Sequence, residues 1–413
     1  MRVLIAAYAE RTHFFHMVPI AWALRTAGHE VRVASQPALM DTIAASGLTA
    51  VSVGADHSWQ DLMDEMADDE EWAERVTEVL GNADSADHET LVRFFAEETK
   101  SFRSFNDSMV DDLVTFARQW QPDLVLWEHF TFAAPIAARV VGAAHVRVLW
   151  GADVLIQLRQ RFLALREKEP PEQRSDVLGD WLDDTLARFG HRFDEEILTG
   201  QRTLEQSPSS MRLPVEVRTV TMRYVPYNGP SVVPDWLREP PGRPRVCITA
   251  GVSMRAFFGF DPIPLSSLRS FAGLDVEVVA TLVRQEGDDT EIPDNVRLVD
   301  FVPMHAILPT CAAVVHIGSA GIVSTALTYG VPQLVLVPDL WDAPVRARML
   351  AEQGAGLELT PDAVTPESIR DAVMRLVTEP AFREAAIRLR DEADAEPAPN
   401  EVVPVLERLA AEP

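Results

Sequence analysis

The sequence predicts an α/β protein built from two doubly wound domains, each with a parallel sheet covered by helices on both faces. Short apolar runs alternate with helical patterns in the first half of the chain, and the same alternation begins again in the second half. A stretch rich in proline separates the two halves. Strands that are apolar on both sides indicate a covered parallel sheet, and 413 residues exceed one ordinary core.

The first domain, residues 1–213, opens with a strand, a loop, a helix ended by Gly28 and a second strand. Residues 56–101 are strongly acidic and show no strand pattern, so we expect a solvated insertion of loops and helices there. The apolar pattern of this domain predicts strands at residues 3–7, 31–34, 124–126 and 146–149, and helices at residues 18–25 and 132–141.

Prolines and glycines cluster in residues 214–243, as expected of a semi-rigid linker to the second domain, residues 244–395. The chain after Pro366 is predicted to be helical, with Pro404 kinking or dividing the last helix, and residues 396–413 are expected to pack back on the first domain. Ligands should bind in a cleft between the domains, at the carboxyl ends of the strands. The second domain's predicted strands are residues 245–250, 276–281, 296–299, 313–316 and 333–337, and its predicted helices are residues 263–271, 320–329 and 345–353.

The composition argues against several classes of protein. Lys and Arg number 37 and Asp and Glu 63, and a net charge of −26 argues against nucleic-acid or membrane-surface partners. Cys247 and Cys311 lie in apolar stretches, which indicates buried thiols in a reducing compartment, and two are too few for a structural zinc site. The first residues lack a signal-peptide pattern, and no apolar run is long enough to span a membrane. We therefore expect a soluble, cytoplasmic protein.

The turn after the first strand holds two histidines and no glycine. The absence of glycine before Gly28 removes the dinucleotide fingerprint and argues against a nicotinamide or flavin enzyme. His13 and His16 are placed where a histidine can face the cleft as a general base near neutral pH. The alternative is that they only cap or solvate the turn.

A second group of small and polar residues follows a strand of the second domain. His316 ends the strand, and Gly318 and Gly321 lie where a helix begins, so backbone N–H groups and the helix dipole could approach a phosphate. Such glycines are also common as packing devices. Asp342 follows the next strand, where its carboxylate could bind hydroxyls or an ammonium group, or only cap a helix.

Several blocks of the chain resemble the antibiotic-type family of nucleotide-sugar-dependent glycosyltransferases, which have two facing Rossmann-like domains in the GT-B fold. The resemblance spans nearly the whole chain. Within the family, the chain is most similar to the branch that moves aminodeoxysugars, such as desosamine, onto polyketides. The blocks are MRVL at residues 1–4, VPIAWALRTAGHEV at 18–31, WEHFTFAAPIAA at 127–138, RYVPYNGPSVVP at 223–234, FVPMHAILPTCAAVVHIGSAG at 301–321 and YGVPQLVL at 329–336.

The resemblance implies roles for individual residues. His13 matches the family's general base, and Glu128 matches an Asp that orients it, with an arm longer by one methylene. On the donor side, His316 matches a diphosphate-contacting histidine and Phe301 a residue that stacks on the pyrimidine. The remaining matches are Val302 for the base, the backbone of Gly318, Ser319, Ala320, Gly321 and Ile322 for phosphate, and Ser253 as a weaker phosphate contact.

Two departures from the family bear on the donor. Many relatives have His-His-Gly-Gly where this chain has His316-Ile317-Gly318-Ser319, so one side-chain donor is replaced and a hydroxyl is added. Many also have Asp-Gln where this chain has Asp342-Ala343, and alanine cannot bond sugar hydroxyls. The second change fits a sugar with few hydroxyls, or a weaker sugar site.

Together these features predict inverting transfer of a deoxysugar, expected to be an aminodeoxysugar, from a dTDP-sugar to a hydroxyl of a macrolide or anthracycline polyketide. No metal or cofactor is expected. Two alternatives stay open: a sugar-nucleotide epimerase on the same fold, and a non-catalytic nucleotide-sugar-binding subunit. The hydrophobic acceptor is expected to lie against aromatic residues of the first domain that could equally be core, namely Phe14, Phe15, Trp59 and Phe130.

The resemblance also implies a protein partner. Close relatives need a helper related to cytochrome P450 but lacking its haem chemistry, and the acidic stretch before Ser101 is a hypothetical contact surface for it. The oligomeric state is left open, with a homodimer as one alternative.

Overall fold

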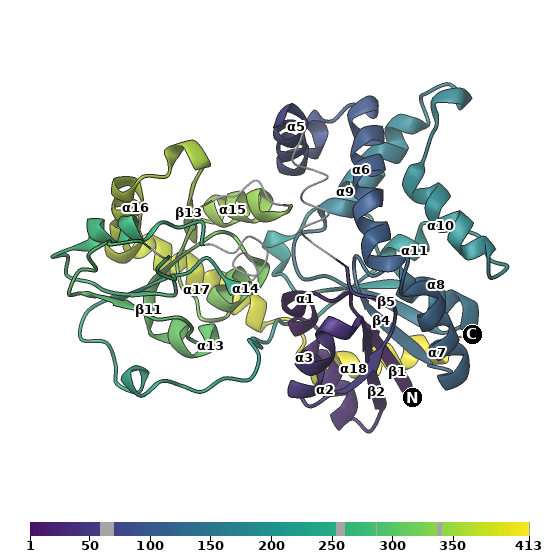
Figure 1. Cartoon of the computed structure of the whole chain (residues 1–413), viewed down its shortest axis with the longest axis horizontal. Coiled ribbons are helices and arrows are strands. Elements are labelled where there is room, and N and C mark those ends of the chain that lie inside the picture. Colours follow the sequence, from purple (N-terminus) through teal and green to yellow (C-terminus); the bar gives the residue numbers. More distant parts are fainter. Residues whose placement is uncertain (58–69, 253–260, 286, 337–340, 413) are drawn as a thin grey trace. The chain divides into compact units, whose positions relative to one another are not determined.

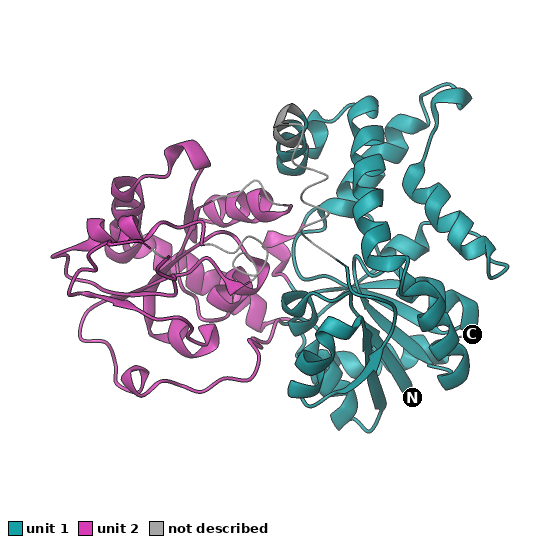
Figure 2. Ribbon diagram, viewed as in Figure 1, with its two compact units in different colours: residues 1–206, 213–223, 397–413 teal, residues 207–212, 224–396 magenta. Residues whose placement is uncertain are grey.

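The computed structural model describes residues 1–57, 70–252, 261–285, 287–336 and 341–412. The chain divides into two compact units, which Figure 2 colours separately. Unit 1 consists of Met1–Gln206, Leu213–Arg223 and Pro397–Pro413, and unit 2 consists of Ser207–Arg212 and Tyr224–Glu396.

Unit 1 is built on a seven-stranded sheet in the order β3-β2-β1-β4-β5-β6-β7, and every neighbouring pair is parallel. The central strands β1, β4 and β5 are almost entirely buried, as expected of strands covered on both faces. The strands are β1 (Arg2–Ala6), β2 (Glu30–Ser35), β3 (Thr49–Ser52), β4 (Leu124–Glu128), β5 (Ala144–Val148), β6 (Arg202–Glu205) and β7 (Thr219–Thr221).

Helices cover both faces of this sheet, with α2 and α3 on one side and α7 and α8 on the other (Figure 1). The α-helices of unit 1 are α1 (Arg11–Phe15), α2 (Val18–Thr26), α3 (Met40–Ala45), α5 (Glu70–Gly81), α6 (His88–Asn106), α7 (Val110–Trp120), α8 (Ala133–Val141), α9 (Val154–Arg166), α10 (Val177–Ala187), α11 (Glu196–Thr199) and α18 (Pro399–Ala411). Short 3-10 turns occur at Pro37–Leu39, Ala83–Ser85 and Pro171–Gln173.

Unit 2 has a six-stranded sheet in the order β10-β9-β8-β11-β12-β13, again parallel throughout. Its strands are β8 (Arg245–Ile248), β9 (Glu277–Ala280), β10 (Val296–Leu298), β11 (Cys311–His316), β12 (Gln333–Leu336) and β13 (Gly356–Leu359). Its α-helices are α13 (Met304–Ile307), α14 (Ala320–Thr328), α15 (Ala343–Glu352), α16 (Pro366–Thr378) and α17 (Pro380–Asp394), with 3-10 turns at Ser209–Met211, Asp235–Leu237, Leu265–Phe271, Leu308–Thr310 and Pro361–Ala363.

Both sheets reverse their strand order at one place, between β1 and β4 in unit 1 and between β8 and β11 in unit 2. In doubly wound folds the loops that follow such neighbouring strands diverge and leave room for a ligand at the carboxyl ends of the strands. The predicted architecture of two doubly wound domains is therefore confirmed, and each unit has one such switch point. The helix predicted at residues 263–271 is present as a 3-10 helix, Leu265–Phe271, and not as an α-helix.

The boundary between the units in the middle of the chain lies elsewhere than composition predicts. The proline-rich residues 214–243 are not one connector, because β7 pairs with β6 and residues as far as Arg223 belong to unit 1. At the other end, α18 packs in unit 1, where His29 Nε2 lies 2.9 Å from Glu407 Oε1. Pro404 lies inside α18 without dividing it.

None of the helices in the described part of the chain combines the length and apolar character needed to cross a bilayer.

Candidate functional site

His13 and Glu128 meet at the switch point of unit 1. Strands β1 and β4 are neighbours with Ala6 opposite Trp127, so the segment after β1 lies beside Glu128, the last residue of β4. His13 is on the short helix α1 rather than in a loop as predicted, because the Glu10 side chain caps that helix. His13 Nδ1 lies 3.3 Å from Glu128 Oε1.

The Glu128 carboxylate is buried and held by donors from two strand ends. Its Oε2 atom accepts from the Phe130 amide at 3.1 Å and from Thr131 Oγ1 at 2.9 Å. Its Oε1 atom accepts from Trp150 Nε1 at 2.9 Å and also faces His13. Burial alone raises the pKa of Glu128, but the contact with His13, the charge of His129 and the Trp150 bond together hold it at about 2. Glu128 is therefore ionised at neutral pH.

An aromatic shell surrounds His13. The Trp150 ring lies 4.4 Å from the His13 ring, centroid to centroid, and the Tyr8 ring meets it edge-on at 5.3 Å. The Phe130 ring follows at 6.4 Å. Because the His13 side chain is 17% exposed, this shell leaves part of the ring open. A histidine backed by a buried carboxylate can accept a proton as a general base.

Of the predicted acceptor residues, Phe130 lies in this shell and Phe14 does not. Phe14 is fully buried in the core, on the inner side of α1, so it has no surface for a ligand. Phe15 is half-buried and lies 6.3 Å from Phe14. Trp59 is outside the described residues.

Sequence reasoning did not identify Trp150, although it contacts both members of the pair. Trp150 follows β5, whose residue Val148 lies opposite Glu128 in the neighbouring strand. An aromatic residue just beyond the carboxyl end of a central parallel strand was the available signal. Its partner could be recognised only from the register of the strands.

In unit 2, His316 ends β11 and its ring lies in the core rather than on a surface. Nδ1 accepts from the Gly318 amide at 2.9 Å, so Nε2 bears the proton and donates to Gln333 Oε1 at 2.9 Å. Burial lowers the pKa of His316 to about 4, which keeps the ring neutral at physiological pH. The ring is 0% exposed with both nitrogens bonded inside the protein, so this placement differs from the predicted contact with a diphosphate.

The turn after His316 is tightly constructed. Gly318 has φ of +80°, and a Cβ there would lie 3.1 Å from the Ala343 Cβ atom, so only glycine fits without a shift. Ser319 occupies the N-cap of α14 without a side-chain cap bond, followed by Ala320, Gly321 and Ile322 in the first turn. The first backbone N–H groups of an α-helix have no partner within the helix, so this end can bind an anion.

Asp342 contributes to the same turn through Arg346. It is 1% exposed and forms an ion pair with Arg346 within α15. The Arg346 guanidinium donates from Nη2 and Nε to the Gly318 carbonyl at 2.6 and 3.1 Å. Asp342 thus lies at the N-cap position of α15, the alternative to a sugar contact, and is buried against Arg346, a residue that the sequence did not suggest. A contact with sugar hydroxyls stays a prediction.

The remaining donor residues differ in exposure. Phe301 is 49% exposed after β10, which is unusual for a large apolar ring, whereas Val302 beside it is buried at 1%. A neighbouring loop also reaches the turn, because a Cβ at Gly251 would lie 3.4 Å from Ser319 Oγ. Ser253 lies outside the described residues.

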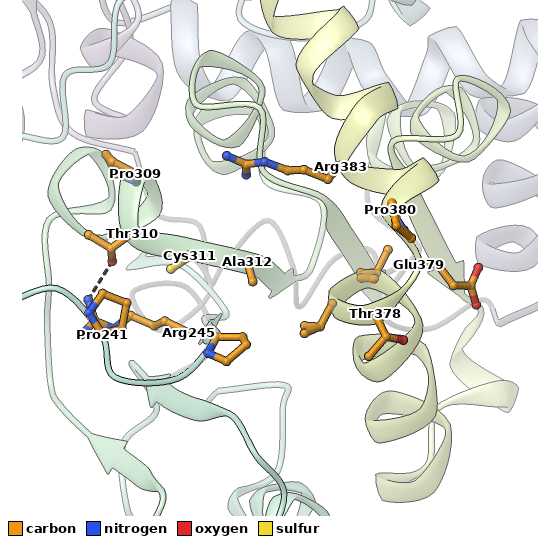
Figure 3. Close-up of a pocket in the computed structure, with 13 residues that line it drawn as sticks. Pro241, Arg245, Pro309, Thr310, Cys311, Ala312, Thr378, Glu379, Pro380 and Arg383 are labelled. Carbon is orange, nitrogen blue, oxygen red and sulfur yellow. Dashed lines mark hydrogen bonds between the residues drawn. The ribbon is translucent and has the colours of Figure 1, made fainter.

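A separate cavity of about 370 Å³ opens at the amino ends of the strands of the unit 2 sheet (Figure 3). It is lined by Arg245 and Cys311, which begin β8 and β11, and by Pro380, which begins α17. At this end of the sheet, Arg245 Nη1 donates to Thr310 Oγ1 at 2.7 Å. The cavity is at the amino ends of the strands, so it is distinct from the turn after His316. Among the described residues, no His, Cys, Asp and Glu side chains gather in a group able to hold a metal ion.

Comparison with known proteins assigns the chain to a family. Two family models match it: the N-terminal domain of erythromycin biosynthesis protein CIII-like proteins over residues 22–251, and the C-terminal domain of the same proteins over residues 266–409. The 10-deoxymethynolide desosaminyltransferase of Streptomyces venezuelae is 51% identical over 417 residues, which cover 100% of this chain and 98% of that protein. The aklavinone 7-beta-L-rhodosaminyltransferase of Streptomyces galilaeus is 49% identical over 429 residues, with 100% and 96% covered.

A solved structure agrees with the fold. The glycosyltransferase VinC, crystallised in complex with dTDP, has a TM-score of 0.88 and 42% identity, with 100% of both chains covered. Both the sequence and the fold thus match over the whole length. The chain belongs to the erythromycin biosynthesis protein CIII-like family and is a glycosyltransferase with the GT-B fold.

Proposed function

We propose that this glycosyltransferase moves an aminodeoxysugar from a dTDP-sugar to a hydroxyl group of a polyketide aglycone. The observation that supports it most is full-length identity near 50% to relatives named as a desosaminyltransferase and a rhodosaminyltransferase, whose names give 10-deoxymethynolide and aklavinone as acceptors. The His13–Glu128 pair supplies the base that such a transfer requires.

In the proposed reaction, His13 deprotonates the acceptor hydroxyl. Its Nδ1 atom faces Glu128, so Nε2 is the atom that takes the proton. The acceptor oxygen attacks the anomeric carbon as the bond from that carbon to the diphosphate oxygen breaks, which inverts the anomeric configuration and releases dTDP. Ionised Glu128 then stabilises the imidazolium that has formed.

On the donor side, we assign the diphosphate to the backbone amides at the start of α14 and the thymine to the face of Phe301. The helix end offers N–H groups and the positive end of its dipole, and Phe301 is exposed. His316 would act through the shape of the turn, since its ring bonds Gly318 and Gln333. The VinC complex with dTDP supports this class of donor. The proposed steps use no metal.

The proposal is tested by product analysis. The chain is incubated with a dTDP-aminodeoxysugar and either 10-deoxymethynolide or aklavinone, and products are identified by mass spectrometry. A glycoside and an equal amount of dTDP support the transfer. A rearranged dTDP-sugar formed without acceptor supports an epimerase, and binding of dTDP without any turnover under all conditions supports a non-catalytic subunit.

We also propose a P450-like helper protein as a partner, and the assay should include it. A homodimer of the chain is a separate proposal for its oligomeric state. The acidic residues 61–89 are the proposed contact. The described part of this stretch contains α5, whose Arg75 donates from Nη2 to the carbonyl of Ser85, in the following turn, at 3.1 Å. Deleting residues 61–89 should abolish capture of the helper in a pull-down, and unchanged capture would refute the contact. The free, buried thiols Cys247 and Cys311 accord with a proposed cytoplasmic location.

A further inference from the structure

We propose that Trp150 is a positioning residue of the transfer, acting through Glu128 to hold His13 in the orientation that accepts the acceptor's proton. This inference rests on the proposed function, because it assigns Trp150 a part in the same step. It is based on one side chain that contacts both members of the pair through different parts of its indole ring.

The indole N–H determines which carboxylate oxygen faces the histidine. Trp150 Nε1 donates to Glu128 Oε1 at 2.9 Å, and His13 Nδ1 lies 3.3 Å from that same oxygen. The other oxygen, Oε2, is held by Phe130 and Thr131, residues that follow Glu128 directly. Trp150 is thus the donor to this carboxylate that comes from the next strand.

The indole ring also packs on the imidazole. The two ring centroids are 4.4 Å apart with an interplanar angle of 34°, and His129 lies against the same indole at 4.7 Å. A ring packed this closely restricts rotation of the His13 side chain. The carboxylate and the imidazole are therefore both held by Trp150.

The length of Glu128 explains why a third residue is useful. A glutamate has one more rotatable bond than an aspartate, so its carboxylate can adopt more orientations at the end of the arm. Bonds to Oε2 alone leave Oε1 free to turn away from His13. A hydrogen bond to Oε1 from β5's end removes that freedom, because β5 lies beside β4 and carries Trp150 just past Val148.

A double-mutant cycle tests this inference with the full chain, helper and both substrates. The variants are Trp150→Phe, Glu128→Gln and the double variant, and His13→Ala is measured in the same assay. Trp181→Phe is the matched control. Trp181 Nε1 donates to Asp107 Oδ1 at 3.0 Å, so this substitution removes a comparable indole–carboxylate hydrogen bond in the same unit. Incorporating 3-benzothienylalanine at position 150 replaces only the N–H and covers the case in which Trp150→Phe does not fold.

We expect Trp150→Phe to lower kcat about tenfold to a hundredfold with the KM for the dTDP-sugar within about twofold of the original value. In the Glu128→Gln background the same change should cost less than about threefold, because the residue through which it acts is already altered. Activity of Trp150→Phe equal to that of Trp181→Phe, or an equal loss in both backgrounds, would overturn the inference. If His13→Ala keeps full activity, the proposed function itself fails, which separates the two outcomes.

Discussion

Gln333 and His316 are joined by a hydrogen bond of 2.9 Å between the first residue of β12 and the last residue of β11. Gln333 Nε2 in turn donates to the Val323 carbonyl of α14 at 3.4 Å. These two hydrogen bonds, the Gln333 relay, connect β11, the turn after it and helix α14. His316, which resembles a ligand-binding residue of the family, therefore shapes the turn before α14 from inside the core.

The relay predicts a pH-dependent stability. Folding lowers the pKa of His316 from 6.5 to about 4, so the unfolded chain takes up the proton first as the pH falls. This group's contribution is present above pH 6.5 and is lost between pH 6.5 and 4, by about 3 kcal/mol. Urea denaturation should show a smaller loss over this range for His316→Gln than for wild type.

The matched control for that experiment is His305→Gln, a half-buried histidine of the same unit that bonds Asn228. A slope with pH that is unchanged by His316→Gln would mean that the ring is not held neutral in the core.

Replacement of the proposed base should abolish most of the activity. His13→Ala is expected to lower kcat by about 10² to 10⁴, or roughly 3–5 kcal/mol, because general-base assistance is lost. Binding of dTDP, measured by calorimetry, should be unchanged, since the proposed donor residues belong to unit 2. Loss of nucleotide binding together with activity would indicate a folding defect instead.

Shortening the carboxylate should be costly although the charge is kept. In Glu128→Asp the carboxylate cannot both keep its bonds to Phe130 and Thr131 and reach Trp150 and His13. We expect kcat to fall at least about tenfold with little change in the KM for the donor. Wild-type kcat in this variant would show that the length of the arm is unimportant and that the contacts to Oε1 do not matter.

The exposed ring of Phe301 should contribute to nucleotide affinity. Base–aromatic stacking is worth about 1–3 kcal/mol, so Phe301→Ala should weaken dTDP binding by roughly five- to 150-fold in calorimetry. Phe301→Trp should retain binding. Val232→Ala is the control, because Val232 is an 84% exposed apolar residue of the same unit. Equal affinities for Phe301→Ala and the control would exclude the stacking role.

Most strands that contain an apolar run could be predicted from the sequence, and most strands without one could not. β1, β4, β8, β11 and β12 are largely apolar on both faces, as expected of strands covered on both sides, and this gives nearly continuous apolar runs. β5 is equally buried but carries His145 and Arg147. The edge strands β3, β7 and β13 are short and partly exposed, so they lack such runs and are not predicted. β6 is not predicted either: it is largely buried, but its four residues, Arg-Thr-Leu-Glu, contain no apolar run.

The candidate site was only partly predictable for a related reason. His13 is a candidate from its place after the first strand as well as from the family resemblance, Glu128 from the resemblance alone, and their proximity follows from the pairing of β1 with β4. The bonds of Trp150 to Glu128 and of Arg346 to Gly318 depend on strand register and on how a turn packs against α15, which apolar periodicity does not report. For the same reason His316 and Asp342 were predicted to face a ligand, whereas both are buried.

The most direct test compares wild type and His13→Ala in one reaction with a dTDP-aminodeoxysugar, a polyketide aglycone and the helper protein. Glycoside and dTDP are quantified together by liquid chromatography and mass spectrometry. The account predicts one dTDP released for each glycoside formed, inversion at the anomeric carbon, and a rate in His13→Ala about one hundredth of wild type or less. A His13→Ala rate close to wild type, or turnover of the dTDP-sugar with no glycoside, would contradict it.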